Sequence, residues 1–500
     1  MDLAFENLAK RFMGIWRTSG ATGQQVVRGS ALIFVERFIV KIVYFARTVI
    51  LARLLFPADF GLFGMATLAM NIPGVFTNPA FSSAIVQKKE VAEGELDSVW
   101  TIYLIRSFVL ALILFFGAPL AGIFFHNPAV VPLAKALSLM YLIMGFESLG
   151  ATLLQKEMKF NKVFIYDVSG VVVEVAVTIV SAFVLRNAWA LLLGAIAGRL
   201  VFTTVSYLVH PWRPRLNFHF ADAGPLFRFG KWLGLGGILF FFASQGDNLM
   251  IGRLLDASAL GFYSIAFSLG TLPAVEIARA LGNVLFPLYS KLQEDLGRLK
   301  SAFFRTASMV FSLTIPAAAG LFVLAREIIA IVYGARWLPM APVLYVIIFL
   351  GLAKSLDFLL NPLLLGTGRA RTSTYIQTIQ AVVMFVLIIP LARSFGIVGV
   401  AISVLAGELV SQLNLLYILR KQIGSVVREL VKVTALPIAA SAIMMATIFL
   451  LKKILPADNA LILALFVFSG AGIYFISLFA LDRLFGRKFY RALVWIKQNS

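Results

Sequence analysis

Long apolar runs recur along nearly the whole chain, and the short breaks between them carry charged, proline or glycine residues. Most runs have about 20 residues, the length that a helix needs to cross a hydrocarbon core of roughly 30 Å. The pattern predicts about fourteen membrane-spanning helices and leaves no segment for a large soluble domain. The predicted ranges are 29–52, 60–86, 98–124, 131–153, 163–185, 188–209, 230–252, 259–287, 302–325, 339–363, 373–392, 396–419, 433–451 and 459–481.

The charges in the breaks test this count independently, because Lys and Arg concentrate in loops on the cytoplasmic side of a membrane. The two ends of the chain and every second break together carry 28 of these residues, whereas the other breaks carry eight. A wrong number of spans would scramble this alternation. We therefore expect both termini in the cytoplasm. Much of the net charge of +20 then reflects topology, and nucleic-acid binding is not needed to explain it.

Composition agrees with an integral membrane protein, since 60% of the residues are hydrophobic and only 14% are charged. The chain has no cysteine, which excludes disulfides and thiolate metal sites, and its three histidines lack metal-ligand spacing. We expect no metal and no cofactor. Residues 1–28 lack the pattern of a cleavable signal peptide. They fit an interfacial amphipathic helix and a disordered basic tail about equally.

An internal repeat relates the two halves of the chain. Residues 53–73, RLLFPADFGLFGMATLAMNIP, align without a gap on residues 253–273, RLLDASALGFYSIAFSLGTLP. Six spans therefore form a unit that occurs twice, and both copies enter the membrane from the same side. Transporters built from such parallel repeats place substrate in the central cleft. The most informative identities at the offset of 200 are Arg53 with Arg253, Gly61 with Gly261, and Pro73 with Pro273.

The predicted fold class is an all-α polytopic membrane protein with two pseudo-symmetric six-helix lobes and two further C-terminal helices. The lobe boundaries follow from the repeat and from the charged breaks. We expect a basic amphipathic cytoplasmic tail at 1–28, an N-lobe at 29–209, a cytoplasmic linker at 210–229, a C-lobe at 230–419, two helices within 420–482 and a basic cytoplasmic tail at 483–500.

Sixteen charged residues lie four or more positions inside the predicted spans. At about 2.5–3.5 kcal/mol each in lipid, they would together cost roughly 40–55 kcal/mol. A typical fold has only about 5–15 kcal/mol of net stability. Most of them must therefore face one another, an interface or a water-filled cavity. They are Arg37, Lys41, Arg47, Arg106, Lys135, Arg199, Arg279, Lys354, Glu36, Glu147, Asp167, Glu174, Asp247, Glu276, Asp357 and Glu408.

The helix predicted at 29–52 has one polar face on which three cations accompany a single acid, Glu36. This excess of positive charge predicts an anionic partner, and a basic, partly desolvated cleft suits a phosphate or diphosphate. Two other acid–base pairs have i,i+3 spacing and can either neutralise each other or serve transport. The substrate-binding candidates are Arg47, Lys41, Arg37, Arg279 and Lys354; the candidates for a coupling proton or sodium ion are Asp247, Glu276, Asp357 and Glu408.

Three stretches resemble a known family. ILARLLFPADFGLFGMA, SAIVQKKE and GDNLMIGRLLDASALGFYSIAFSLGTLP are similar to polysaccharide transporters of the multidrug/oligosaccharidyl-lipid/polysaccharide exporter superfamily, which has a MATE-like fold. Within it the chain most resembles Wzx-type flippases of O-antigen and exopolysaccharide repeat units. The resemblance implies a bacterial inner-membrane protein that moves an undecaprenyl-diphosphate-linked oligosaccharide by alternating access. It further implies coupling to an ion gradient or to the membrane potential, and a polysaccharide polymerase or co-polymerase as partner.

The chain departs from a more distant relative, the lipid II flippase. Arg47 stands in the sequence context of an essential cavity arginine of that relative, but Thr77 and Ser268 occupy the positions of two others. This departure argues against lipid II as the substrate.

Two other functions compete with flipping. A MATE-like multidrug or cation antiporter would favour an acidic cleft, against which the basic face at 29–52 speaks. A membrane enzyme acting on lipid-linked sugars would need an extended external loop, and the predicted outer loops are short. We therefore expect a transporter and not an enzyme or a scaffold.

Overall fold

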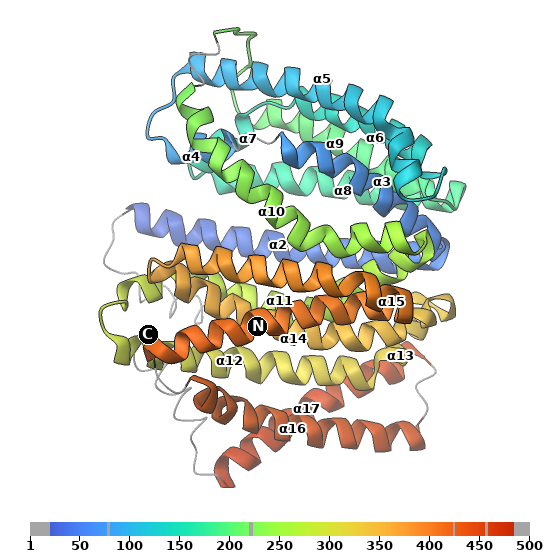
Figure 1. The fold of residues 1–500 in the computed structure, drawn as a ribbon, viewed down its shortest axis with the longest axis vertical. Coiled ribbons are helices and arrows are strands. Elements are labelled where there is room, and N and C mark those ends of the chain that lie inside the picture. The colour runs from blue at the N-terminus through green and yellow to red at the C-terminus, as the bar shows by residue number, and fades with distance from the viewer. Residues whose placement is uncertain (1–20, 78–80, 220–223, 424–425, 456–458, 485–500) are drawn as a thin grey trace. The chain divides into compact units, whose positions relative to one another are not determined.

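The computed structural model describes residues 21–77, 81–219, 224–423, 426–455 and 459–484. These residues form helices and connections without any strand, as Figure 1 shows. Residues 1–20 of the predicted tail at 1–28, residues 220–223 of the linker and residues 485–500 of the tail at 483–500 lie outside them, and residues 21–28 belong to a helix. The α-helices are α2 (Ala21–Leu54), α3 (Pro57–Phe76), α4 (Phe81–Gln87), α5 (Glu93–Phe124), α6 (Val130–Gly145), α7 (Gly150–Lys156), α8 (Phe160–Leu185), α9 (Trp189–Val209), α10 (Gly224–Leu254), α11 (Ala257–Lys291), α12 (Leu296–Val323), α13 (Ala325–Ile328), α14 (Ala341–Gly366), α15 (Ala370–Ile423), α16 (Val426–Ile454) and α17 (Ala460–Leu484).

Ten helices of the described residues are long and apolar enough to cross a membrane, or eleven if the bent pair α6 and α7 is one span. The chain is a multi-pass membrane protein. Helix α2 is 34 residues long but is not among the ten, because it carries four charged residues within twelve positions, from Glu36 to Arg47. The all-helical prediction is confirmed, and the exact number of fourteen spans stays a prediction.

Several helices bend or reverse where the sequence interrupts an apolar run. The predicted span at 131–153 is two helices, α6 and α7, that meet at an angle of 56°. Within α15 the chain breaks at Gly396, whose φ of 58° and ψ of −136° lie in a region that glycine adopts without steric cost. Gly407 packs against the backbone of Gln380, so the two parts of α15 lie against each other. This is the break predicted between 392 and 396.

By internal packing the chain divides into two compact units. Unit 1 comprises residues 1–244 and 256–261, and unit 2 comprises residues 245–255 and 262–499. In unit 1, helices α8 and α9 lie side by side (Figure 1) because Gly194 and Gly198 present no side chain to α8. A Cβ on Gly198 would lie 2.6 Å from Cβ of Glu174. Small residues four positions apart are a common means of close packing between membrane helices.

Unit 1 also contains a reciprocal contact between repeat-related positions. A Cβ on Gly61 would lie 2.9 Å from Cα of Ala257, and a Cβ on Gly261 would lie 2.7 Å from the carbonyl carbon of Pro57. Positions 57 and 257, like 61 and 261, are separated by the offset of 200 that relates the two repeats. The glycines conserved between the repeats therefore allow the beginnings of α3 and α11 to touch through their backbones.

In unit 2, the helices α11, α12, α14 and α15 enclose one apolar core with the start of α16, and α16 and α17 form a second with the end of α12. Pro316 lies inside α12 and cannot donate a backbone hydrogen bond to the carbonyl of Ser312. The hydroxyl of Tyr474 on α17 donates to that carbonyl instead, at 2.7 Å. An apolar cavity of about 390 Å³ lies beside this contact, between α12, α16 and α17.

Gly61→Ala is expected to destabilise the protein by about 1–3 kcal/mol, because the new methyl group meets backbone atoms that cannot rotate away. The measurement is the midpoint of thermal unfolding of the purified chain, followed by tryptophan fluorescence. Gly117→Ala on α5 is the matched control, since its Cβ would meet nothing within 4 Å. Equal midpoints for Gly61→Ala and the wild type would contradict the backbone contact.

Candidate functional site

Arg47 of α2 forms an ion pair with Glu174 of α8 inside unit 1. Nη1 of Arg47 lies 2.5 Å from Oε1 of Glu174, and the hydroxyl of Tyr44 donates to Oε2 at 2.8 Å. The guanidinium also lies over the Tyr44 ring, 4.9 Å from its centroid. Both charged side chains are 18% exposed, so the pair is not fully enclosed by protein. An acidic group thus faces the cation that the sequence identified.

The local sequence explains this arrangement. Tyr44 and Arg47 are three positions apart and therefore share one face of α2. On α8, the hydroxyl of Thr178 donates to the backbone carbonyl of Glu174, and the glycines of α9 let that helix press against the same turn. Helix α8 therefore holds Glu174 between α9 on one side and α2 on the other.

The remaining charges of α2 are distributed differently. Glu36 is buried and forms a side-chain hydrogen bond with Asp167 of α8, close to Arg37. The side chains of Arg37 and Lys41 are exposed. The excess of cations along α2 itself is thus offset in part by α8, which contributes Asp167 and Glu174.

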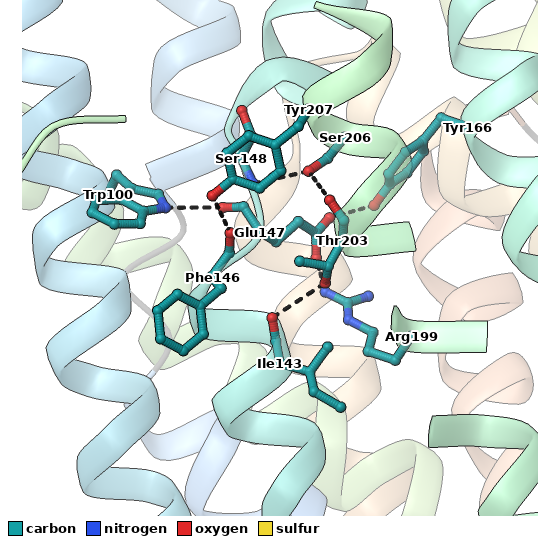
Figure 2. A network of polar contacts seen from close by, with 10 residues as sticks. All are labelled: Trp100, Ile143, Phe146, Glu147, Ser148, Tyr166, Arg199, Thr203, Ser206 and Tyr207. Carbon is teal, nitrogen blue, oxygen red and sulfur yellow. Dashed lines mark hydrogen bonds and ion pairs between the residues drawn. The ribbon is translucent and has the colours of Figure 1, made fainter. Parts of the chain in front are cut away.

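A second charged network occupies the bend between α6 and α7 (Figure 2). Arg199 of α9 forms an ion pair with Glu147, and the hydroxyl of Tyr166 donates to the same carboxylate. The backbone groups freed by the bend are also bonded. The indole of Trp100 donates to the carbonyl of Glu147 at 3.1 Å, and the hydroxyl of Tyr207 donates to the carbonyl of Phe146 at 2.5 Å.

Two further bonds in Figure 2 tie this bend to α9. The hydroxyl of Thr203 donates to the carbonyl of Ile143 at 3.2 Å, and the backbone N–H of Ser148 donates to Oγ of Ser206 at 3.0 Å. Side chains can satisfy interrupted backbone inside a membrane protein in this way. Glu147 and Arg199 are among the predicted intramembrane charges but not among the predicted site residues. The charged, glycine-flanked segment GFESLG at 145–150 is the signal that marks the bend.

Unit 2 gathers three of the predicted site residues. Glu408 of α15 is fully buried, and its Oε2 lies 3.7 Å from Nζ of Lys354 on α14. Its carboxylate also accepts hydrogen bonds from Gln380 at 2.6 Å and from Gln412 at 2.9 Å. Asp357 forms a side-chain hydrogen bond with Glu408. The salt bridge of Lys354 is therefore made across two helices, with Glu408, while its charge also acts on Asp357 of its own helix.

Asp247, another predicted residue of unit 2, has hydrogen bonds of its own. Asp247 is buried and accepts a hydrogen bond from the hydroxyl of Tyr263 at 2.7 Å and one from the backbone of Asn248. Glu276 is partly buried on α11. The side chain of Arg279 lies outside what the structure describes, so its pairing with Glu276 stays a prediction.

One cluster lies in the connections outside the membrane-spanning helices. Glu157, after α7, pairs with Lys159 at 2.8 Å and with the ring of His210, after α9, at 3.3 Å. The hydrogen bond from Lys159 is the main reason why the pKa of Glu157 is lower than its ordinary value, and His210 acts in the same direction. These contacts join the connections at one end of unit 1.

Comparison with known proteins shows the family of this chain. The family model described as polysaccharide biosynthesis protein matches residues 50–342. The chain belongs to this family. It is 27% identical over 395 residues to the lipopolysaccharide biosynthesis protein WzxC of Escherichia coli (strain K12), an alignment that covers 78% of this chain and 80% of that protein.

The chain is also 26% identical over 301 residues to the succinoglycan biosynthesis transport protein ExoT of Rhizobium meliloti (strain 1021), which covers 60% of this chain and 61% of that protein. The fold is similar to that of the lipid II flippase MurJ in an inward closed conformation, with a TM-score of 0.73 and 17% identity over 90% of this chain and 99% of that one. The predicted family is confirmed, and so is a transport protein rather than an enzyme.

We expect the Glu147–Arg199 pair to contribute measurably to stability. Glu147→Gln leaves the arginine without a carboxylate and is expected to cost about 1–3 kcal/mol, because the two side chains are only 17% and 24% exposed. Arg199→Gln alone should have a similar cost. In the double variant the two losses should not add, and the free energy of unfolding in a denaturant series measures this coupling. If the two losses add, the side chains are not coupled, and the ion pair contributes nothing to the free energy of unfolding.

Proposed function

We propose that this protein is a flippase that moves undecaprenyl-diphosphate-linked oligosaccharide repeat units across the bacterial inner membrane by alternating access. The product would be an exopolysaccharide, O-antigen or capsule. Family membership supports the proposal, as do the names of the relatives, which describe lipopolysaccharide synthesis and succinoglycan transport. The proposal includes fourteen spans in two six-helix lobes with two further helices, and cytoplasmic termini. A polysaccharide polymerase or co-polymerase is the proposed protein partner.

The observation that carries the proposal is the partly accessible Arg47–Glu174 pair within apolar helices. Both side chains are 18% exposed, and because contact with lipid is costly for charges inside a span, we infer that the exposed part faces a water-filled cavity. A diphosphate can compete with Glu174 for the guanidinium, since Arg binds phosphate and carboxylate with the same planar fork. Exchange of one anion for the other would couple substrate binding to the contact between α2 and α8.

The cluster around Glu408 is the proposed site of ion coupling. Two carboxyl groups, Asp357 and Glu408, share one ammonium group, from Lys354. The formal charge of the three groups is −1 when all are ionised, so one proton or one sodium ion would neutralise them. Asp247 and Glu276 are the further candidates for this role.

Arg47→Ala is expected to abolish surface polysaccharide, because the variant loses the cation that would bind the diphosphate. Quantifying the polysaccharide on intact cells measures the effect, and immunoblots of membranes check protein abundance. Lys135→Ala is a matched control, since this intramembrane cation is exposed and lies over the Phe115 ring instead of beside an acid. Normal polysaccharide from Arg47→Ala would remove Arg47 from the mechanism, and drug efflux by the wild type would favour the antiporter.

Glu408→Gln is expected to uncouple transport from its driving ion, because the substitution removes one of the two carboxylates. In proteoliposomes, an imposed proton or sodium gradient should accelerate flipping of the lipid-linked substrate by the wild type but not by the variant. Glu157→Gln, in the connection after α7, is the control that also removes one carboxylate. An undiminished response of Glu408→Gln to both gradients would place the coupling site elsewhere.

A further inference from the structure

Arg106 of α5 differs from the other arginines described so far in what it binds. Its Nε donates to the carbonyl of Thr77 at 2.9 Å and to the hydroxyl of Thr77 at 3.0 Å, and Nη2 donates to the carbonyl of Gly74 at 2.7 Å. All of these acceptors are neutral. Arg47 and Arg199, in contrast, each face a carboxylate.

The position of these acceptors explains why a cation is tolerated there. Helix α3 contains Pro73 and ends at Phe76, so its last carbonyl groups lack helical donors. The C-terminal end of a helix carries about half an elementary negative charge, which favours a neighbouring cation. Nearby, the hydroxyl of Tyr141 donates to the carbonyl of Met70. The end of α3 therefore holds the guanidinium in place but offsets only part of its charge.

Arg106 also has hydrogen-bond donors left over. A guanidinium has five N–H groups, and the bonds above use Nε and one N–H of Nη2. Nη1 takes part in none of them, and it is not one of the buried atoms that lack a partner. By contrast, Nε of Arg47 and Nε of Arg199 are enclosed without a partner. One edge of the Arg106 guanidinium is thus bonded to α3, and the side chain, which is partly exposed, keeps donors for a further acceptor.

The depth of Arg106 makes contact with lipid unfavourable. It lies eight residues inside the predicted span at 98–124, or about 12 Å along the helix. That depth is within the hydrocarbon region, whose half-thickness is about 15 Å. A cation without a carboxylate is costly there unless it faces a water-filled cavity.

We propose that Arg106 binds a phosphate group of the substrate, and this inference rests on the proposed flippase function. With the end of α3 as its support, the guanidinium presents its free donors to the diphosphate in the geometry that suits a bidentate contact. Arg47 lies seven residues before the end of α2, about 10 Å from the connection between α2 and α3. Thr77 follows the last residue of α3, about 30 Å from the same connection. Arg106 and Arg47 therefore lie about 20 Å apart along the helix axes, with Arg106 nearer the predicted cytoplasmic side. The diphosphate meets Arg106 before it reaches Arg47.

The test compares binding of geranylgeranyl diphosphate and of geranylgeraniol to the purified full-length chain in detergent, measured by microscale thermophoresis. Arg106→Gln can still donate to the carbonyls of α3 but has no charge. It is expected to weaken binding of the diphosphate by about tenfold or more and to leave binding of the alcohol unchanged. Arg106→Lys keeps the charge without the fork and should give an intermediate loss. It also serves as the test if the Gln variant does not fold.

Two control variants separate charge from structure. Lys135→Gln removes another intramembrane cation, and Tyr141→Phe removes the hydrogen bond to Met70 while leaving Arg106 in place. Both should bind the diphosphate as the wild type does. Unchanged affinity of the Arg106 variants, or an equal loss in Tyr141→Phe, would overturn the inference and leave Arg106 as a cap of α3. If the wild type itself does not prefer the diphosphate to the alcohol, the flippase proposal fails first.

Discussion

A charged side chain inside a membrane must find a partner that replaces water, and this requirement organises much of the structure. In unit 1, Glu174 and Asp167 of α8 face the basic side of α2, and Glu147 at the bend after α6 faces Arg199 of α9. In unit 2, Glu408 joins α15 to Lys354 of α14. Each contact links two helices whose apolar surfaces alone would allow many packings. Polar pairs of this kind select one arrangement, although their net contribution to stability is modest.

Close approach of the helices is what brings these pairs within reach. Gly194 and Gly198 let α9 press against the turn of α8 that carries Glu174. Gly407 packs against the backbone of Gln380, whose amide donates to Glu408, the neighbour of that glycine in the sequence. The glycines and the charged residues thus act together, since a methyl group at the crossing would move the helices apart and lengthen the polar contacts.

Interrupted helices present a second demand for polar partners. At the bend between α6 and α7, the freed carbonyls accept hydrogen bonds from Trp100, Tyr207 and Thr203. Beyond Pro73, the carbonyls at the end of α3 accept from Arg106. Such segments are held by side chains of neighbouring helices and not by the helix itself. Their conformation therefore depends on how the neighbouring helices are placed.

The sequence alone determined the membrane class, the positions of most helix breaks and the family. These properties follow from local quantities: the length of an apolar run, a glycine or proline at a turn, and motifs read along the chain. The sequence also identified the charged residues of the intramembrane clusters described above. It did not determine their partners, because Arg47 and Glu174 are 127 positions apart and nothing local relates them. Spacing on one helix suggested that Lys354 pairs with Asp357, whereas the packing of α14 against α15 places it with Glu408. Only the tertiary structure decides which charges neutralise each other, since that depends on which helix faces meet; the same packing leaves Arg106 bonded to neutral oxygens.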